Sequence, residues 1–168
     1  MPMTIWGFRD RRALLRMRHL DWESTIAELG LRGKGSRESG AFLLSDRDGD
    51  RRTVTRVVYF DDLDPNCLAG GIELDGLAYS KLWDICDAEK RRVIGDMHTH
   101  PGREVNQSSI DAANPMIAQE GHLGLILPYL AMYSIGAKEV GIHRYDGRRW
   151  QSWTGRDAER HLSISRLR

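Results

Sequence analysis

Residues 92–111 read RVIGDMHTHPGREVNQSSID, and this stretch is the most informative in the chain. Its first part is largely apolar and predicts a short strand that runs into His98 and His100. Side chains two residues apart lie on the same face of a strand, so both imidazoles can converge on one ion. Asp111 follows after ten intervening residues, in the first turn of a predicted helix, and a loop of that length can return its carboxylate to the strand end. Two imidazoles and one carboxylate leave a fourth position for water, as in catalytic zinc sites.

Each part of this pattern also has a purely structural explanation. A histidine at the end of a strand is more often solvated or part of the core than a metal ligand. Residues 108–111 also match a helix capping box, which occurs widely for structural reasons. Pro101 can simply end the strand. Chance is nevertheless a poor explanation for all of these residues in this order and at this spacing.

In that order and spacing the residues resemble the JAMM (JAB/MPN-type) metalloproteases. The family motif is His-Ser/Thr-His-Pro-x6-Ser-x2-Asp, and it matches residues 98–101, Ser108 and Asp111. The family also places a catalytic glutamate well upstream, before a buried strand. Glu38 occupies that place here, directly ahead of residues 39–44.

The resemblance covers roughly residues 22–154, with two departures near the glutamate. Ala41 stands where the family has a second glycine, and Ser45 stands where a glycine often closes the motif. Both departures affect how closely a substrate backbone can approach that strand. They leave the residues of the chemistry intact.

The resemblance implies a role for each matching residue. His98, His100 and Asp111 would bind one Zn²⁺ ion, which lowers the pKa of a bound water to about 7. Glu38 would take the proton of that water as general base and return it to the departing amine as general acid. The Ser108 hydroxyl would help to stabilise the oxyanion. The implied activity is that of a zinc metalloprotease.

The resemblance also implies a substrate class. The family cleaves isopeptide or peptide bonds that follow the C-terminal glycine of ubiquitin or a ubiquitin-like protein. Residues 95–102 look most like bacterial members, which accompany E1-like and E2-like enzymes in ubiquitin-like conjugation systems, including antiphage operons. The expected partners are therefore a ubiquitin-like protein, its conjugates and these two kinds of enzyme. Residues 61–76 lie where the family commonly carries an insertion that shapes the substrate groove.

The rest of the chain predicts an α/β domain with a central mixed sheet flanked by helices, and the resemblance implies the cytidine-deaminase-like MPN (JAB) fold. Apolar periodicity and turn residues predict the elements. They are a helix from Trp22 capped by Asp21, a hairpin of residues 39–44 and 53–60, an acidic loop at 61–76, helices at 77–88 and 109–119, a buried strand at 123–127, and a hairpin of 140–145 and 149–153. The expected division is an N-terminal extension (1–21), the metalloprotease domain (22–154) and a basic C-terminal tail (155–168).

Composition narrows the class of protein. The 168 residues suit one domain, and 25 Lys and Arg against 24 Asp and Glu give a net charge of +1. That balance provides no overall basic field for nucleic acid or membrane, so neither is an expected partner. The arginine pairs, among them residues 51–52 and 91–92, are interpreted as solvated faces or partner contacts. With two cysteines in no disulfide or metal spacing and no secretory or membrane-spanning run, the chain is expected to be cytoplasmic.

Alternative readings stay open. One is a peptidase that acts on a ubiquitin-like sulfur carrier, and another is a non-catalytic MPN scaffold, which the complete set of ligands disfavours. A RadC-type nucleic-acid role is disfavoured because those proteins usually read His-Asn-His-Pro, whereas Thr99 stands here. Four further histidines lack ligand spacing and are expected to be structural or exposed: His19, His122, His143 and His161. The sequence leaves undecided the identity of the substrate, deconjugation as against precursor processing, and the oligomeric state.

Overall fold

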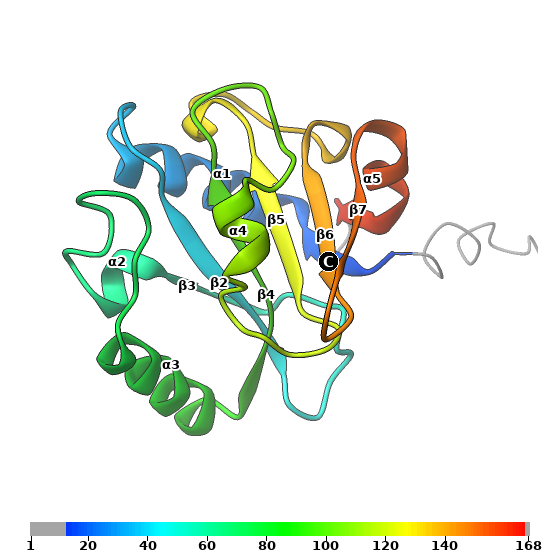
Figure 1. Cartoon of the computed structure of the whole chain (residues 1–168). Coiled ribbons are helices and arrows are strands. Elements are labelled where there is room, and N and C mark those ends of the chain that lie inside the picture. The colour runs from blue at the N-terminus through cyan, green and yellow to red at the C-terminus, as the bar shows by residue number, and fades with distance from the viewer. Residues whose placement is uncertain (1–12, 167–168) are drawn as a thin grey trace, which may run out of the picture.

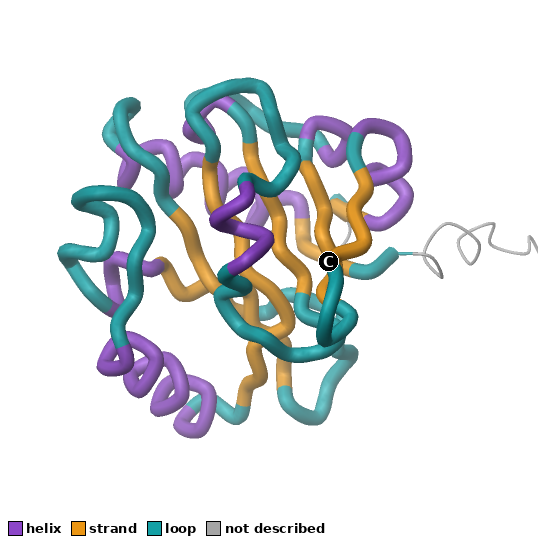
Figure 2. The backbone as a smooth tube through the Cα atoms, in the orientation of Figure 1, coloured by secondary structure: helices purple, strands orange, loops and turns teal. Residues whose placement is uncertain are grey.

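The computed structural model describes residues 13–166, and its centre is a six-stranded sheet (Figures 1 and 2). The strand order is β3-β2-β4-β5-β6-β7. The strands are β2 (Gly40–Asp46), β3 (Arg56–Tyr59), β4 (Arg91–Thr99), β5 (Leu123–Leu127), β6 (Gly141–Tyr145) and β7 (Trp150–Trp153). The helices are α1 (His19–Gly33), α2 (Phe60–Leu63), α3 (Gly76–Ala88), α4 (Ser109–Ala113) and α5 (Gly155–His161), with short 3-10 turns η2 (Tyr129–Ala131) and η3 (Ala137–Glu139).

The sheet is mixed, because β4 and β5 run parallel whereas the other neighbouring pairs run antiparallel. The predicted α/β class with a central mixed sheet flanked by helices is therefore confirmed. Both predicted hairpins are also present, β2 with β3 and β6 with β7. In the second hairpin Gly147 adopts a φ of +96°, which suits glycine in the predicted Asp146-Gly147 turn.

Alternation along the strands sends side chains to two separate cores. On one face, Ala41 and Leu43 of β2 pack in the same apolar cluster as Trp22 of α1. On the other face, Phe42 and Leu44 pack in a cluster that includes residues of α2 and α3. Figure 1 shows α1 behind the sheet, with α3 and α4 in front of it. The face that carries α3 and α4 also carries the predicted metal ligands, as described below.

Three predicted boundaries are wrong. Helix α1 begins at His19, ahead of the predicted Trp22, and Asp21 lies in its first turn, where its carboxylate accepts two hydrogen bonds from the Arg18 guanidinium. Helix α4 ends at Ala113, well short of residue 119, because Pro115 follows and lacks a backbone N–H. The predicted loop at 61–76 begins within the single-turn helix α2.

The two ends of the described chain lie together. Strand β1 (Leu15–Arg18) pairs in parallel with β8 (Leu162–Ser165), and Leu15 and Leu162 are buried in the same core as α1. The division at residues 21 and 155 stays a prediction, and in the structure both flanking segments contribute to the core of the middle one. Within residues 13–166, none of the helices has the length and apolar character needed to cross a bilayer.

Candidate metal centre

The side chains of His98, His100 and Asp111 converge at one point. His98 Nε2 lies 3.2 Å from His100 Nε2. The Asp111 carboxylate faces both rings, with Oδ1 3.6 Å from His98 Nε2 and Oδ2 3.3 Å from His100 Nε2. One ligand atom from each residue lies within 4.8 Å of the other two, so the three residues form a group that could hold a metal ion.

This geometry fits zinc. Two nitrogens bound at about 2.0–2.1 Å to a tetrahedral Zn²⁺ lie roughly 3.3 Å apart. The separation of the two Nε2 atoms, 3.2 Å, is close to that value. Two imidazole lone pairs that face one another at this distance repel unless a positive charge lies between them, and a borderline-soft cation such as zinc suits two nitrogens and one carboxylate oxygen.

Hydrogen bonds at the far side of each ring orient the two histidines. The Nδ1–H of His100 donates to the carbonyl oxygen of Glu104 at 3.1 Å, which leaves Nε2 with its lone pair free to bind a metal. His98 Nδ1 lies 3.9 Å from Oδ2 of Asp96. Oδ1 of that carboxylate accepts a hydrogen bond from His122 Nε2 at 2.6 Å. Carboxylates and carbonyls placed in this way fix the orientation of metal-binding histidines.

The charges of the site are coupled. Burial alone would lower the pKa of His98, but the carboxylates of Asp111 and Asp96 raise it to about 9. Burial acts to raise the pKa of Asp111, yet the two histidines and Ser108 hold that pKa well below its usual range. Asp96 is fully buried, and hydrogen bonds from His122 and His98 keep its pKa below the usual range as well. The site therefore presents two carboxylates in their charged form, which attract a cation.

A capping box presents Asp111 to the histidines. The Ser108 hydroxyl accepts a hydrogen bond from the Asp111 N–H at 3.1 Å, and the Ser108 N–H donates to Asp111 Oδ2 at 2.8 Å. The structural explanation and the ligand explanation of residues 108–111 therefore hold together, because the cap fixes the same carboxylate that faces both imidazoles. The Ser108 hydroxyl accepts in this cap and so keeps its own O–H as a donor.

His143 anchors the loop between β4 and α4. Its Nε2–H donates to the Val105 carbonyl oxygen at 2.9 Å, and its Nδ1 accepts from the Ser152 hydroxyl at 2.8 Å. Burial lowers the pKa of His143, which favours this neutral form. The loop can approach β6 this closely only because Gly141 has no side chain, since a Cβ there would overlap the Val105 oxygen.

Sequence reasoning treated His122 and His143 as structural or exposed, and both are buried. It missed their contacts with the metal centre, His122 through Asp96 and His143 through Val105. The one local signal was a histidine within or next to each of the predicted strands 123–127 and 140–145.

Glu38 lies beside the group without belonging to it. Gly40 pairs with His98 across β2 and β4, and the Thr99 N–H donates to the Ser39 carbonyl oxygen at 2.9 Å. One residue further out, Glu38 is level with His100. Residues that face one another in an antiparallel pair share a face, so Glu38 is on the ligand face of the sheet. Its side chain is half-buried and makes no hydrogen bond or ion pair with the residues that the structure describes.

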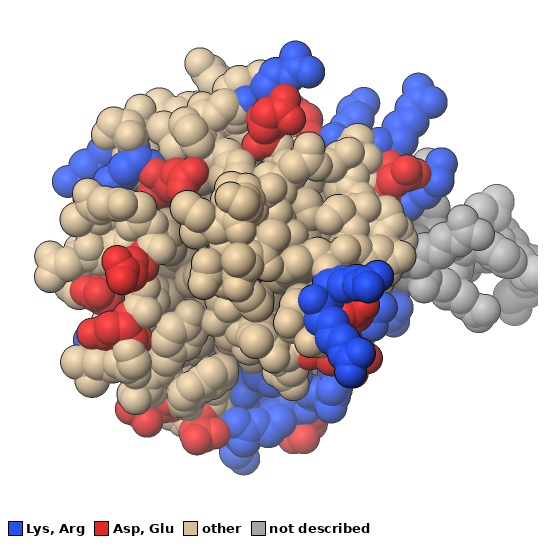
Figure 3. Space-filling model, in the orientation of Figure 1, with Lys and Arg blue, Asp and Glu red and all other residues tan. Residues whose placement is uncertain are grey.

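The surface around α4 carries few charges. Figure 3 shows this face with a broad uncharged centre, while Lys, Arg, Asp and Glu gather mainly around its edge. The His98 and His100 side chains keep 12% and 14% of their surface exposed and Asp111 keeps 25%, so the group is accessible from solvent.

Comparison with known proteins gives the fold. No family model matches the chain. The structure is similar to the solution structure of protein DSY2949 from Desulfitobacterium hafniense, with a TM-score of 0.59, 18% sequence identity, and coverage of 83% of this chain and 90% of that one. The two chains share a fold.

Two more solved structures match with a TM-score of 0.45 each. One is AF2198, a JAB1/MPN domain protein from Archaeoglobus fulgidus, at 13% identity over 90% of this chain and 98% of that one. The other is described as a JAMM, a metalloprotease-like zinc site in the proteasome and signalosome, at 16% identity over 89% and 97%. Scores at this level are too low to assign a function, so the assignment below rests on the residues of the site.

Proposed function

We propose that the protein is a zinc-dependent metalloprotease of the JAMM type. The observation that carries this proposal is the convergence of His98 Nε2, His100 Nε2 and the Asp111 carboxylate at distances that suit one zinc ion. Three protein ligands leave a fourth position for a reactant, which is the arrangement of catalytic zinc and differs from closed structural sites.

Each residue of the chain has a defined task in peptide hydrolysis. When bound, zinc supplies a water of lowered pKa and a positive charge that polarises the scissile carbonyl. Glu38 accepts the proton of the attacking water and then delivers it to the departing amine. Its side chain suits this task because it lies on the ligand face and has no competing partner among the described residues. Ser108 donates its free O–H to the oxygen that becomes negative as the carbonyl is attacked.

The proposed substrates are bonds that follow the C-terminal glycine of a ubiquitin-like protein. The resemblance of residues 98–111 to the family motif supports this class. The tail of such a protein is extended, and extended segments bind by adding a strand to a sheet edge. Strands β3 and β7 form the two edges of the central sheet here. The uncharged face around α4 offers room for a folded protein (Figure 3). E1-like and E2-like partners and a role in antiviral defence stay predictions of the resemblance.

A substrate trap tests the proposal. Glu38→Ala should keep zinc but not cleave, so it should retain substrate when it is isolated from the native cell and examined by mass spectrometry. Wild-type protein with zinc is then added to the captured material, and Asp111→Ala serves as a control without metal. Release of a small ubiquitin-like protein from a lysine, by wild type alone, supports a deconjugating isopeptidase.

Other outcomes favour the alternatives. Shortening of an unconjugated carrier favours precursor processing or the sulfur-carrier peptidase. A protein that binds zinc in the test tube, captures nothing small and cleaves nothing contradicts the protease proposal and favours the scaffold.

A further inference from the structure

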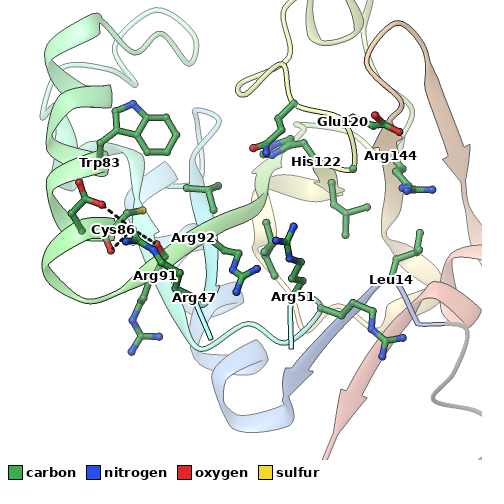
Figure 4. Close-up of a pocket in the computed structure, with 17 residues that line it drawn as sticks. Leu14, Arg47, Arg51, Trp83, Cys86, Arg91, Arg92, Glu120, His122 and Arg144 are labelled. Atoms are coloured by element: carbon green, nitrogen blue, oxygen red, sulfur yellow. Dashed lines mark hydrogen bonds and ion pairs between the residues drawn. The ribbon is translucent and has the colours of Figure 1, made fainter. Parts of the chain in front are cut away.

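A second site lies at the other end of β4. Arg91 and Arg92 begin this strand, and Arg92 stands six residues before His98, which is roughly 20 Å along a strand. A pocket of about 870 Å³ opens there, between the end of α3, the connection of β2 to β3, and the starts of β4 and β5 (Figure 4). This pocket is separate from the metal centre and does not depend on the proposed protease activity.

Arginine dominates the lining of the pocket. Six arginines line it, against two carboxylates, Asp87 and Glu120. The arginines are Arg47, Arg51, Arg52, Arg91, Arg92 and Arg144. They come from segments far apart in the sequence, so the fold gathers a positive charge that the net charge of +1 does not reveal.

Half of these arginines already have acidic partners. Arg47 pairs with Asp87 at 2.7 Å, so this carboxylate of the lining is engaged. Arg52 pairs with Asp50 at 3.3 Å. Arg91 lies 3.0 Å from Asp46 and 3.1 Å from Glu89.

The other three, Arg51, Arg92 and Arg144, have no acidic partner in residues 13–166. Arg51 and Arg144 are exposed and form no hydrogen bond there through their side chains. Arg92 donates one hydrogen bond, from Nη2 to the Asp46 carbonyl oxygen at 3.2 Å. Its Nε is buried and has no partner among the described residues. A buried donor without a partner is costly, and an anion in the pocket would satisfy it.

The shape and the side chains indicate the class of ligand. Guanidinium groups bind phosphate through paired hydrogen bonds, which makes arginine the preferred residue for that group. Figure 4 shows Arg51 and Arg92 projecting into the middle of the pocket, with Trp83 on one wall and Arg144 on the opposite side. The indole of Trp83 is 45% exposed and offers an aromatic surface for stacking. The volume falls within the range of small-molecule sites, about 300–1,000 Å³.

We propose that this pocket binds a phosphorylated small molecule of nucleotide size. Arg51, Arg92 and Arg144 would hold the phosphate groups, and Trp83 would stack against an aromatic part of the ligand. A concave pocket with charge on opposed walls suits a compact polyanion better than the long backbone of a nucleic acid.

Calorimetry on the full-length, zinc-loaded protein tests the proposal with defined probes. Pyrophosphate and ATP should bind, ATP more tightly, and adenosine should not. Citrate and a hexaglutamate peptide test whether any polyanion suffices, and a single-stranded DNA 20-mer tests nucleic acid. Failure of both phosphate probes to bind overturns the proposal, as does equal binding of citrate or hexaglutamate. Tighter binding of the DNA than of ATP also overturns it.

Variants show whether the probes bind in this pocket or at the metal. Arg51→Gln and Arg144→Gln replace exposed side chains and should each weaken ATP binding by about 10- to 100-fold, the usual contribution of a hydrogen bond to a charged group. Arg148→Gln removes the same charge outside the pocket and should leave binding unchanged. Unaltered ATP binding in the Arg51→Gln/Arg144→Gln double variant would place the probe elsewhere and overturn the proposal.

Discussion

Asp96 and His122 form a buried hydrogen bond of 2.6 Å between two neighbouring parallel strands, next to the metal centre. The same carboxylate lies 3.9 Å from Nδ1 of His98. Asp96 therefore connects a histidine that no motif indicated to one of the three metal ligands. Because the carboxylate is held from its other side by His122, its position beside the His98 ring is fixed before any metal binds.

The first prediction concerns this carboxylate. Asp96→Asn keeps the size of the side chain but removes the negative charge that orients the His98 ring. Loss of such an outer partner typically lowers metal affinity about 10- to 100-fold. The affinity for zinc is measured by competition with a chelator. Asp84→Asn, an exposed residue of α3, is the matched control and should bind zinc as wild type does. Equal affinity in Asp96→Asn and wild type would show that Asp96 does not orient His98.

The second prediction separates metal binding from proton transfer. Asp111→Ala removes one of three ligands and should lose zinc, whereas Glu38→Ala should retain zinc and lose cleavage. Zinc content is measured by mass spectrometry after gel filtration, and cleavage is measured on the material captured by the trap. The ligand assignment is wrong if Asp111→Ala retains as much zinc as wild type.

The third prediction concerns Ser108. Ser108→Ala removes a donor to the oxyanion and should lower the cleavage rate about 10²- to 10³-fold. It also removes the cap of α4, which typically lowers the free energy of unfolding by about 1 kcal/mol. Zinc should still bind, because the backbone N–H that holds Asp111 Oδ2 is unchanged. Ser109→Ala is the control, and a similar loss of rate there would point to a general effect on the helix.

The fourth prediction tests how the loop before α4 is held. A Cβ at Gly141 would overlap the Val105 oxygen and lie 2.9 Å from His143 Nε2. Gly141→Ala should therefore displace the loop and lower both zinc affinity and the free energy of unfolding, the latter by about 1–3 kcal/mol. At Gly124, on the neighbouring strand, the nearest atom to an added Cβ is 3.7 Å away, on Trp150. Gly124→Ala should be tolerated, and similar behaviour of the two variants would contradict this account.

The fifth prediction is a pH dependence of metal binding. Although burial acts to lower it, the carboxylates of Asp111 and Asp96 raise the pKa of His98 to about 9 in the metal-free protein. His98 is therefore mostly protonated at neutral pH and must lose its proton to bind zinc. The affinity for zinc should rise as pH increases from 7 toward 9 and level off above that pKa. Calorimetry in buffers of different ionisation enthalpy measures the protons released, and the absence of release at pH 7 would contradict the raised pKa.

Local patterns predicted the parts of the fold that depend on neighbours in the chain. The hairpin at Asp146-Gly147 follows from the turn residues, and the buried face of α3 follows from the apolar spacing of Ala78, Leu82 and Cys86. The start of α1 was wrong because an acidic residue suits the first turn of a helix as well as its cap, so Asp21 did not mark the boundary.

The sequence by itself determined the ligand set and its supporting helix cap. His98 and His100 share a face because a strand repeats every two residues, and Ser108 presents Asp111 because a capping box spans three. Only the tertiary structure decided which distant residues support that site and which gather elsewhere. His122 contacts Asp96 across 26 positions and His143 contacts Val105 across 38, and Arg51, Arg92 and Arg144 meet at one pocket from three different segments. A periodic pattern tells which way a side chain faces, but the packing of sheet and helices decides what it meets there.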